Sequence, residues 1–317
     1  MLKGDGKPFE GPEKKLAVGL TSPVPGFRSL ATQRWRKVVA ASGAEILSRI
    51  GNRFMDAYLL SESSLFVWSD RLLLITCGQT SPLDALPVLL DEIPANLIGN
   101  VSYVRKNFLF PKRQQSDFEA EVAVILPVFP GKSYRLGPAN DDHLHLFYSA
   151  AAPARRKKAL TFALHMRDLP PDAISPFQTA GGTTARDDPS LAGLWGMCRG
   201  MMRDDHFFSP DGYSLNAIRG GRYFTVHVTP QQPGSYASVE TNFASEAVPG
   251  IMGELLAVFR PGRFTLALTT TMDRSTRAAH QRLDLAGTPY RIVEHSRYEF
   301  DCGHLVSFVN GLRAGRH

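Results

Sequence analysis

Side chains capable of nucleophilic and proton-transfer chemistry occur in two apolar segments at similar spacing. Ser63 is followed 14 positions later by Cys77, and Ser214 is followed 13 positions later by His227. A serine hydroxyl attacks carbonyl carbon once a neighbouring group handles its proton, and thiols and imidazoles exchange protons near neutral pH. Both segments are therefore candidate reactive sites.

Each of these segments has the pattern of a β-hairpin, with apolar arms on both sides of a polar turn. The expected arms and turns are 59–68, 69–71 and 72–78 in the first hairpin, and 213–218, 219–222 and 223–229 in the second. Within the first arm, Glu62-Ser63-Ser64 interrupts the apolar run. Such residues either face solvent, mark a β-bulge or serve a chemical purpose, and the pattern alone leaves these alternatives open.

Bulk composition indicates a folded chain. With 317 residues, 43% hydrophobic and 21% charged, the chain can bury one large core or two joined ones. It has neither a run of about 18 apolar residues nor the pattern of a signal peptide, so we expect a soluble, cytoplasmic protein without a membrane partner. Its three widely spaced cysteines favour free thiols over a disulfide framework or a zinc cluster.

The net charge of +6 raises the question of nucleic-acid binding. The basic residues are scattered, and the dense run at 155–158 has no interleaved aromatic residues, so we read it as a solvated loop and expect no nucleic-acid partner. His143 and His145 lie on one side of an expected strand, a spacing compatible with a metal or with simple strand alternation. Because no convincing third ligand accompanies them, we expect no metal.

Further segments predict a β-rich chain with several helices. We expect helices at 32–42, from Ser81 with Pro82 at the first helical position, and at 246–259; strands at 44–50, 97–104, 119–125 and 235–243; and a strand pair around 137–140. A glycine-rich stretch at 181–202 would connect two similar halves, about 1–180 and 181–317. The hairpin in the second half would then be a repeat of the hairpin in the first half.

Three ordered blocks of sequence carry a family resemblance. They are Phe9-Glu10-Gly11-Pro12-Glu13-Lys14; residues 58–67 with Thr76-Cys77-Gly78; and residues 208–216 with His227-Val228-Thr229-Pro230 and residues 235–242. Together they resemble the eukaryotic-type S-adenosylmethionine decarboxylases. Taken alone, the acidic pair Glu10 and Glu13 would be an ordinary helix start or solvated face.

The resemblance implies an α+β fold, a four-layer αββα sandwich of two antiparallel β-sheets with helices outside, arising from an internal duplication. It also implies self-cleavage between Glu62 and Ser63, which yields a β chain 1–62 and an α chain 63–317. Ser63 would become a covalent pyruvoyl group, the only cofactor, and would form a Schiff base with the substrate amine. The implied reaction converts S-adenosyl-L-methionine to its decarboxylated form for spermidine and spermine synthesis.

The same resemblance implies roles for individual residues. Cys77 would be the proton donor in turnover, Ser214 and His227 would act in processing, and Glu10 and Glu13 would line the catalytic pocket. The implied substrate-binding residues are Phe9, which would stack on the adenine, together with Leu60, Glu62, Phe208 and Gln231.

Departures from the family pattern affect substrate and activator binding. Gln231 stands where a glutamate usually binds the ribose hydroxyls, although an amide can still donate and accept hydrogen bonds. Asp187 and Glu240 match the acidic cluster that binds putrescine in animal members, whereas the other network positions are occupied by Ala17, Ile75 and Leu191. Because burying a diamine requires compensating charge, we expect little or no activation by putrescine.

Two alternatives to this activity stay open. Gln231 leaves room for a pyruvoyl decarboxylase that acts on another amino acid, such as ornithine or arginine. A non-catalytic regulatory homologue is the second, although it would not need to retain Ser63, Cys77, Ser214 and His227. The sequence is compatible with either a homodimer or a monomer, since exposed edge strands can pair or be shielded.

Overall fold

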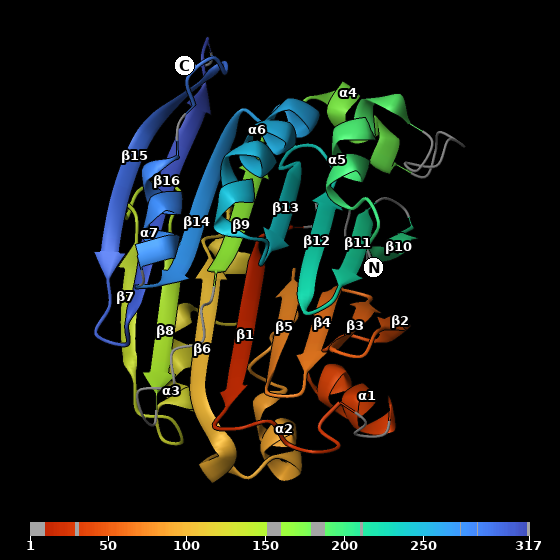
Figure 1. The fold of residues 1–317 in the computed structure, drawn as a ribbon, viewed down its shortest axis with the longest axis vertical. Helices are drawn as coiled ribbons and strands as arrows, with labels where there is room; N and C mark the ends of the chain where they lie inside the picture. The colour runs from red at the N-terminus through yellow and green to blue at the C-terminus, as the bar shows by residue number, and fades with distance from the viewer. Residues whose placement is uncertain are drawn as a thin grey trace. The chain divides into compact units, whose positions relative to one another are not determined.

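The chain forms two units, each built on one eight-stranded antiparallel sheet (Figure 1). The computed structural model describes residues 10–28, 32–150, 160–178, 188–209, 212–272, 274–283 and 285–315. We call residues 12–155 the first unit, and residues 1–11 with 156–317 the second unit.

In the first unit the strands lie in the order β2-β3-β4-β5-β1-β6-β8-β7. Their bounds are β1 Glu13–Leu20, β2 Ile46–Gly51, β3 Met55–Leu60, β4 Ser63–Trp68, β5 Arg71–Cys77, β6 Ile98–Lys106, β7 Lys132–Leu136 and β8 Leu144–Ala150. The helices of this unit are α1 Thr32–Ala41, α2 Leu86–Glu92 and α3 Phe118–Ile125.

In the second unit the strands lie in the order β10-β11-β12-β13-β9-β14-β16-β15. Their bounds are β9 Leu160–Arg167, β10 Met202–Phe207, β11 Tyr213–Arg219, β12 Arg222–Thr229, β13 Tyr236–Thr241, β14 Arg263–Thr271, β15 Tyr290–Glu299 and β16 His304–Arg313. The helices are α4 Pro171–Ile174, α5 Ala192–Met197, α6 Val248–Phe259 and α7 Arg274–Gln281.

The two strand orders are the same once each strand is matched to the one eight numbers later. The predicted α+β class, with two antiparallel sheets and an internal duplication, is therefore confirmed. The predicted match between the two hairpins is wrong by one strand, since β11–β12 corresponds to β3–β4 rather than to β4–β5. Ser63, which begins β4, consequently has its equivalent at Arg222, which begins β12, and not at Ser214.

Each sheet packs helices against one of its faces. In the first unit Trp35 of α1, Leu86 of α2 and Phe118 of α3 form one apolar cluster with Leu16 and Leu65 of the sheet. Burial of such large side chains contributes about 1.5–3 kcal/mol each. These contacts hold the central strands in register from one side.

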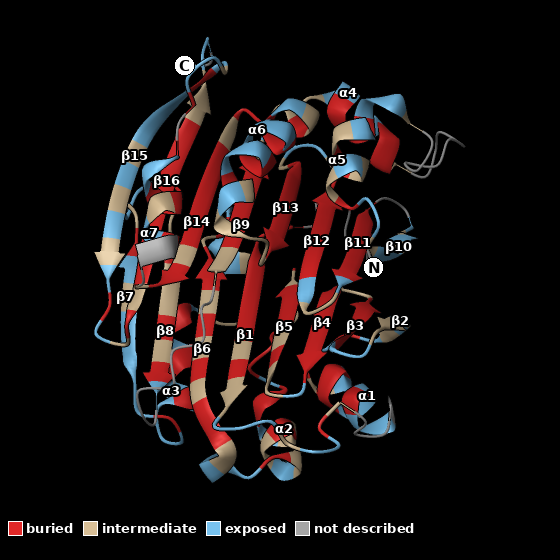
Figure 2. Cartoon of the chain, viewed as in Figure 1, coloured by how far each residue is buried: buried red, intermediate tan, exposed pale blue. Residues whose placement is uncertain are grey.

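The second unit is packed in the same way. Leu194 of α5 and Phe259 of α6 cluster with Leu215 and Val226, which alternate along β11 and β12 with polar residues. The polar residues Ser214, Asn216, Thr225 and His227 lie outside this apolar cluster, yet all are buried. Both faces of the central strands are thus buried, as Figure 2 shows for most of their length.

Two expected elements differ from the observed ones. Residues 119–125, expected as a strand, form helix α3, because the Asp117 carboxylate caps the helix by accepting from the Ala120 N–H at 2.8 Å. The helix expected from Ser81 begins only at Leu86. A start at Pro82 would place Pro87 in the helix interior, where proline removes a hydrogen bond, whereas the observed start leaves Pro87 in the first turn.

The division between the units lies earlier in the chain than expected. Strand β9 already belongs to the second sheet, so the units separate between residues 155 and 156 rather than near residue 180. The basic run at 155–158 lies outside the described residues. Among the described residues, no helix combines the length and apolarity required to cross a bilayer.

Two glycines of the second unit test this packing. Cβ of an alanine at Gly311 would lie 2.3 Å from the Phe264 ring, whereas Gly253 in α6 has open space around its Cβ position. We expect Gly311→Ala to destabilise the protein by about 1–3 kcal/mol. Gly253→Ala should stabilise it by about 0.5–1 kcal/mol, because alanine has the higher helix propensity. Thermal denaturation followed by circular dichroism measures both, and equal melting temperatures for the two variants would contradict the packing described.

Candidate active site

The predicted cleavage bond lies in a two-residue turn between two buried strands. Leu60, the last residue of β3, pairs with Ser63, the first residue of β4, so Ser61 and Glu62 alone make the connection. The expected single arm 59–68 is therefore two strands. Ser63 has φ +133°, a backbone conformation that costs a non-glycine residue about 1–3 kcal/mol.

The equivalent turn of the second unit places its positive φ on glycine. Arg219 pairs with Arg222 across Gly220 and Gly221, and Gly220 has φ +60°. Glycine takes such angles without a steric penalty, and a glycine at the first central position suits a tight hairpin. Of the two equivalent hairpins, only the one that holds the Glu62–Ser63 bond is strained at a serine.

Cys77 lies beside the carbonyl group of this bond. It ends β5, and its Sγ donates a hydrogen bond to the Glu62 carbonyl oxygen at 3.4 Å. The Glu62 carboxylate oxygen Oε2 is 3.9 Å from the same sulfur. Glu13 is the residue directly opposite Cys77 on β1. The first unit therefore brings together Glu13, Glu62 and Cys77, three residues that lie far apart in the sequence.

The surroundings of Cys77 keep its thiol protonated. Burial and the nearby carboxyls of Glu62 and Glu13 raise the pKa of the Cys77 thiol well above its ordinary value, and Lys14 opposes them. Burial also raises the pKa of the Glu62 carboxyl, while the hydrogen bond with Cys77 lowers it. From the reference pKa of cysteine we expected a thiol that loses and regains its proton near neutral pH. The Cys77 thiol instead keeps its proton to higher pH, so it is a proton donor at neutral pH.

Lys14 is a buried cation next to this thiol that the sequence did not single out. Its Nζ donates to the carbonyl oxygens of Gly78 at 3.2 Å and Thr80 at 2.9 Å, and so it holds the turn that follows Cys77. Burial and the charge of Arg105 lower the pKa of Lys14 to about 8. In the sequence, Lys14 is distinguished only by its position directly after Glu13, at the end of the first of the three blocks.

Ser214 and His227 are paired in the second unit. They lie opposite each other on β11 and β12, and Ser214 Oγ is 2.8 Å from His227 Nδ1. The other ring nitrogen, Nε2, is 3.0 Å from Thr225 Oγ1. All three side chains are buried. A hydroxyl and an imidazole held in this way can exchange a proton with a group placed beside them.

The remaining predicted residues are distributed over both units. Leu60 is fully buried, and Glu10 is buried and belongs to the second unit. An alanine at Gly11 would bring its Cβ within 2.6 Å of the Tyr236 ring, so glycine is required for the chain to pass this close to β13. Gln231 follows β12 and is half-buried, as is Phe208 ahead of β11. Phe9 and Asp187 lie outside the described residues.

The histidine pair considered for metal binding has other contacts. His143 Nδ1 is 2.7 Å from the carbonyl oxygen of Asp141, and the rings of His143 and His145 meet edge to face at 5.0 Å. Burial lowers the pKa of both imidazoles. Within the described part of the chain, no group of three or more histidine, cysteine, aspartate or glutamate side chains has the arrangement of a metal site.

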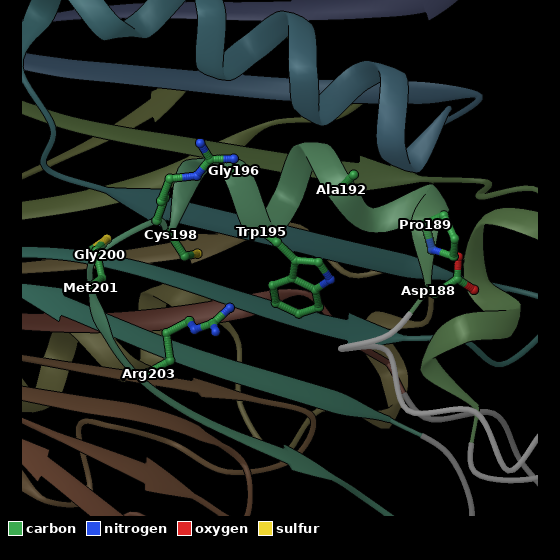
Figure 3. Close-up of a pocket in the computed structure, with 10 residues that line it drawn as sticks. Asp188, Pro189, Ala192, Trp195, Gly196, Cys198, Gly200, Met201 and Arg203 are labelled. Carbon is green, nitrogen blue, oxygen red and sulfur yellow. The ribbon is translucent and has the colours of Figure 1, made fainter.

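A cavity of about 510 Å³ lies in the second unit beside α5 (Figure 3). Arg203 and Trp195 both line this cavity, and the Arg203 guanidinium lies 5.7 Å from the centre of the Trp195 ring. Its one thiol, Cys198, has its pKa raised to about 12 by burial, so it is inert at neutral pH. Since none of the predicted site residues lines this cavity, we do not assign the chemistry to it.

Comparison with known proteins identifies the family. The profile of the adenosylmethionine decarboxylase family matches residues 6–310. An S-adenosylmethionine decarboxylase proenzyme of Dictyostelium discoideum is 32% identical over 323 residues, 95% of this chain and 85% of the relative. One of Leishmania donovani is 33% identical over 334 residues, 96% and 86% of the two chains.

Solved structures agree with this. The crystal structure of the Trypanosoma brucei AdoMetDC-delta26 monomer superposes with a TM-score of 0.61 and 26% identity, covering 79% of this chain and 99% of that one. The family match spans all three sequence blocks that carried the resemblance, and the fold likeness extends over both units. The chain therefore belongs to the adenosylmethionine decarboxylase family.

Proposed function

We propose that this protein is a self-processing, pyruvoyl-dependent enzyme that decarboxylates S-adenosyl-L-methionine. Its product is the aminopropyl donor for spermidine and spermine synthesis. The observation that carries the proposal is the Glu62–Ser63 turn, in which a strained serine follows a carbonyl group that accepts a hydrogen bond from Cys77. Family membership supports the substrate, since the relatives are named S-adenosylmethionine decarboxylase proenzymes.

The first proposed step is an N-to-O acyl shift. Ser63 Oγ attacks the carbonyl carbon of Glu62, the bond from that carbon to the Ser63 nitrogen breaks, and the hydroxyl proton passes to the departing amine. Charge develops on the carbonyl oxygen, where the protonated Cys77 thiol donates a hydrogen bond. Release of the strain at Ser63 favours the cleavage, because about 1–3 kcal/mol corresponds to roughly one to two powers of ten in rate.

The second proposed step is an elimination. His227 removes the α-proton of residue 63, the electron pair forms a carbon–carbon double bond, and the ester bond from the β-carbon breaks, so that the main-chain carboxylate of Glu62 leaves as the new C-terminus of chain 1–62. Water then replaces the nitrogen, which departs as ammonia, and a ketone remains at the start of the α chain 63–317. Ser214, 2.8 Å from His227, would stabilise the oxyanion or orient the breaking bond.

Turnover uses the same residues for binding and proton transfer. The pyruvoyl group supplies an electron-withdrawing ketone that accepts the electrons released with carbon dioxide. Cys77, whose thiol is held protonated, donates the proton that replaces the carboxylate on the substrate. Glu13 lies opposite Cys77 on β1, and its carboxylate is 2.9 Å from Lys15 Nζ.

Several residues of the family pattern are proposed to recognise the substrate. Phe9 would stack on the adenine and attract the sulfonium charge, and Glu10 and Glu13 would attract the same cation. The side chain of Leu60 is fully buried in the apolar cluster of the first unit, so only its main chain could contact the substrate. Phe208 would offer apolar contact, and Gln231 would bind the ribose hydroxyls. A decarboxylase for ornithine or arginine would need neither an aromatic platform nor a ribose contact, and the named relatives favour the S-adenosylmethionine substrate.

Cleavage is tested by intact-mass measurement with a matched pair of serine variants. The wild-type chain of 34.9 kDa should separate into chains 1–62 and 63–317, the larger with a ketone at its N-terminus. Ser63→Ala should stay intact, because it lacks the attacking hydroxyl. Ser64→Ala, at the neighbouring buried position, should still be cut at the Glu62–Ser63 bond.

An activity assay on the same preparations tests the substrate. Carbon dioxide release should be observed from S-adenosyl-L-methionine, and from neither ornithine nor arginine. Turnover by a preparation that contains only unbroken chain would refute the proposed cofactor, and absence of both cleavage and turnover would support the regulatory homologue instead.

The charges around Cys77 predict opposite shifts of its titration. Glu13→Gln removes a negative charge and should lower the pKa of the thiol, whereas Lys14→Met removes a positive charge and should raise it. The rate of alkylation against pH measures this in a background with Cys198→Ser and Cys302→Ser. Asp91→Asn, on the exposed side of α2, is the control and should leave the profile unchanged. Shifts in the same direction for Glu13→Gln and Lys14→Met would contradict the arrangement.

Putrescine should change the rate by less than about twofold. Ile75 and Leu191 are buried apolar residues, and Glu240 already accepts a hydrogen bond from the Tyr223 hydroxyl at 2.6 Å. A buried diamine without compensating charge would be strongly disfavoured. Initial rates with and without putrescine at constant ionic strength measure the effect, and a several-fold increase would show that a diamine site exists.

A further inference from the structure

Four buried side chains on β11 and β12 form a continuous hydrogen-bonded chain. Ser214 lies opposite His227 and Asn216 lies opposite Thr225, so all four share one face of the hairpin. Ser214 Oγ is 2.8 Å from His227 Nδ1, and His227 Nε2 is 3.0 Å from Thr225 Oγ1. The Thr225 hydroxyl donates in turn to Asn216 Oδ1 at 2.9 Å.

The chemistry of these groups sets the direction of each bond. A threonine hydroxyl has one hydrogen, and the hydrogen of Thr225 goes to an amide oxygen, which can only accept. Thr225 Oγ1 is therefore an acceptor toward His227, and Nε2 must carry the ring hydrogen. In a neutral imidazole the other nitrogen then has a lone pair, so Nδ1 accepts the hydrogen of Ser214.

We propose that Thr225 and Asn216 are positioning residues that hold His227 in the tautomer with hydrogen on Nε2. The proposal rests on the proposed role of His227 as the base of the elimination step. In this tautomer the basic nitrogen, Nδ1, is the one that faces Ser214. In the other tautomer an N–H would face Ser214 and the base would point toward Thr225.

The second unit contains a natural comparison at His280. Its ring nitrogens are each 2.8 Å from a hydroxyl, Nε2 from Thr270 and Nδ1 from Ser307, and the side chain is buried. Hydroxyls both donate and accept, so these partners are compatible with either tautomer. Thr270→Val therefore matches Thr225→Val in chemistry and burial while it leaves His227 unchanged.

Processing kinetics give the first readout. We expect Thr225→Val to slow formation of the pyruvoyl end by about tenfold, because the mutation removes the acceptor for Nε2–H. The acyl shift should continue, so the ester at residue 63 should accumulate and be cleaved by added hydroxylamine. Thr225→Ser restores the hydroxyl and should recover most of the rate, and Thr270→Val should process at the wild-type rate.

The tautomer itself gives the second readout, which a merely structural role would not change. In the uncut Ser63→Ala chain labelled with ¹⁵N-histidine, ring-nitrogen shifts should show His227 protonated on Nε2, with His227→Gln identifying its signals. Adding Thr225→Val should shift the population toward Nδ1–H, and adding Asn216→Leu should shift it in the same direction.

The outcomes separate this inference from the proposed function. If the wild type is cut but Thr225→Val is cut equally fast, with unchanged ring-nitrogen shifts, the positioning role is wrong and the enzyme assignment stands. If Thr225→Val and Thr270→Val slow processing equally, the effect is a general loss of packing and the inference also fails. If the wild type is never cut at residue 63, the proposed function fails first.

Discussion

A two-residue connection between two fully buried strands is the constraint on which the candidate site depends. Strands β3 and β4 are buried along their whole length, so their ladder cannot shift to relieve the turn at Ser61 and Glu62. The equivalent hairpin has glycines at this turn, whereas here the positive φ falls on Ser63. The packing of the sheet thus maintains a conformation that the local sequence disfavours, next to a carbonyl that accepts from the Cys77 thiol.

The hydrophobic pattern of the sequence predicted many of the strands and turns. Alternating apolar residues and polar turns located β11, β12 and the turn before β5, because hydrophobic periodicity reports which side chains face the apolar cluster under the helices. Helix α3 was predicted as a strand, since a short apolar run at 119–125 has no distinctive period, and the helix begins at a cap formed by the Asp117 side chain. The correspondence between the halves depends on strand order, which no local pattern contains.

For the candidate site, sequence motifs identified the reactive side chains but not their surroundings. The pairing of Ser214 with His227 could be anticipated, because a hairpin places the ends of its arms opposite each other. The cross-strand position of Glu13 against Cys77 could not, because β1 and β5 are separated by three strands in the chain. The role of Lys14 depends on the carbonyl oxygens that its Nζ reaches, and the role of Thr225 depends on the ring nitrogen that its hydroxyl reaches. The folded backbone alone determines these contacts.

The strand order of the first unit has a consequence for the products of a cut between residues 62 and 63. The shorter product would keep β1, β2 and β3, and β1 lies between β5 and β6 of the longer one, hydrogen-bonded to both. The two polypeptides would share one sheet by interleaving, so dissociation would require the sheet to be opened from within. The two products would thus be an inseparable pair. They would reach this arrangement only by folding as one precursor chain before the cut, and they could not be exchanged between molecules afterwards.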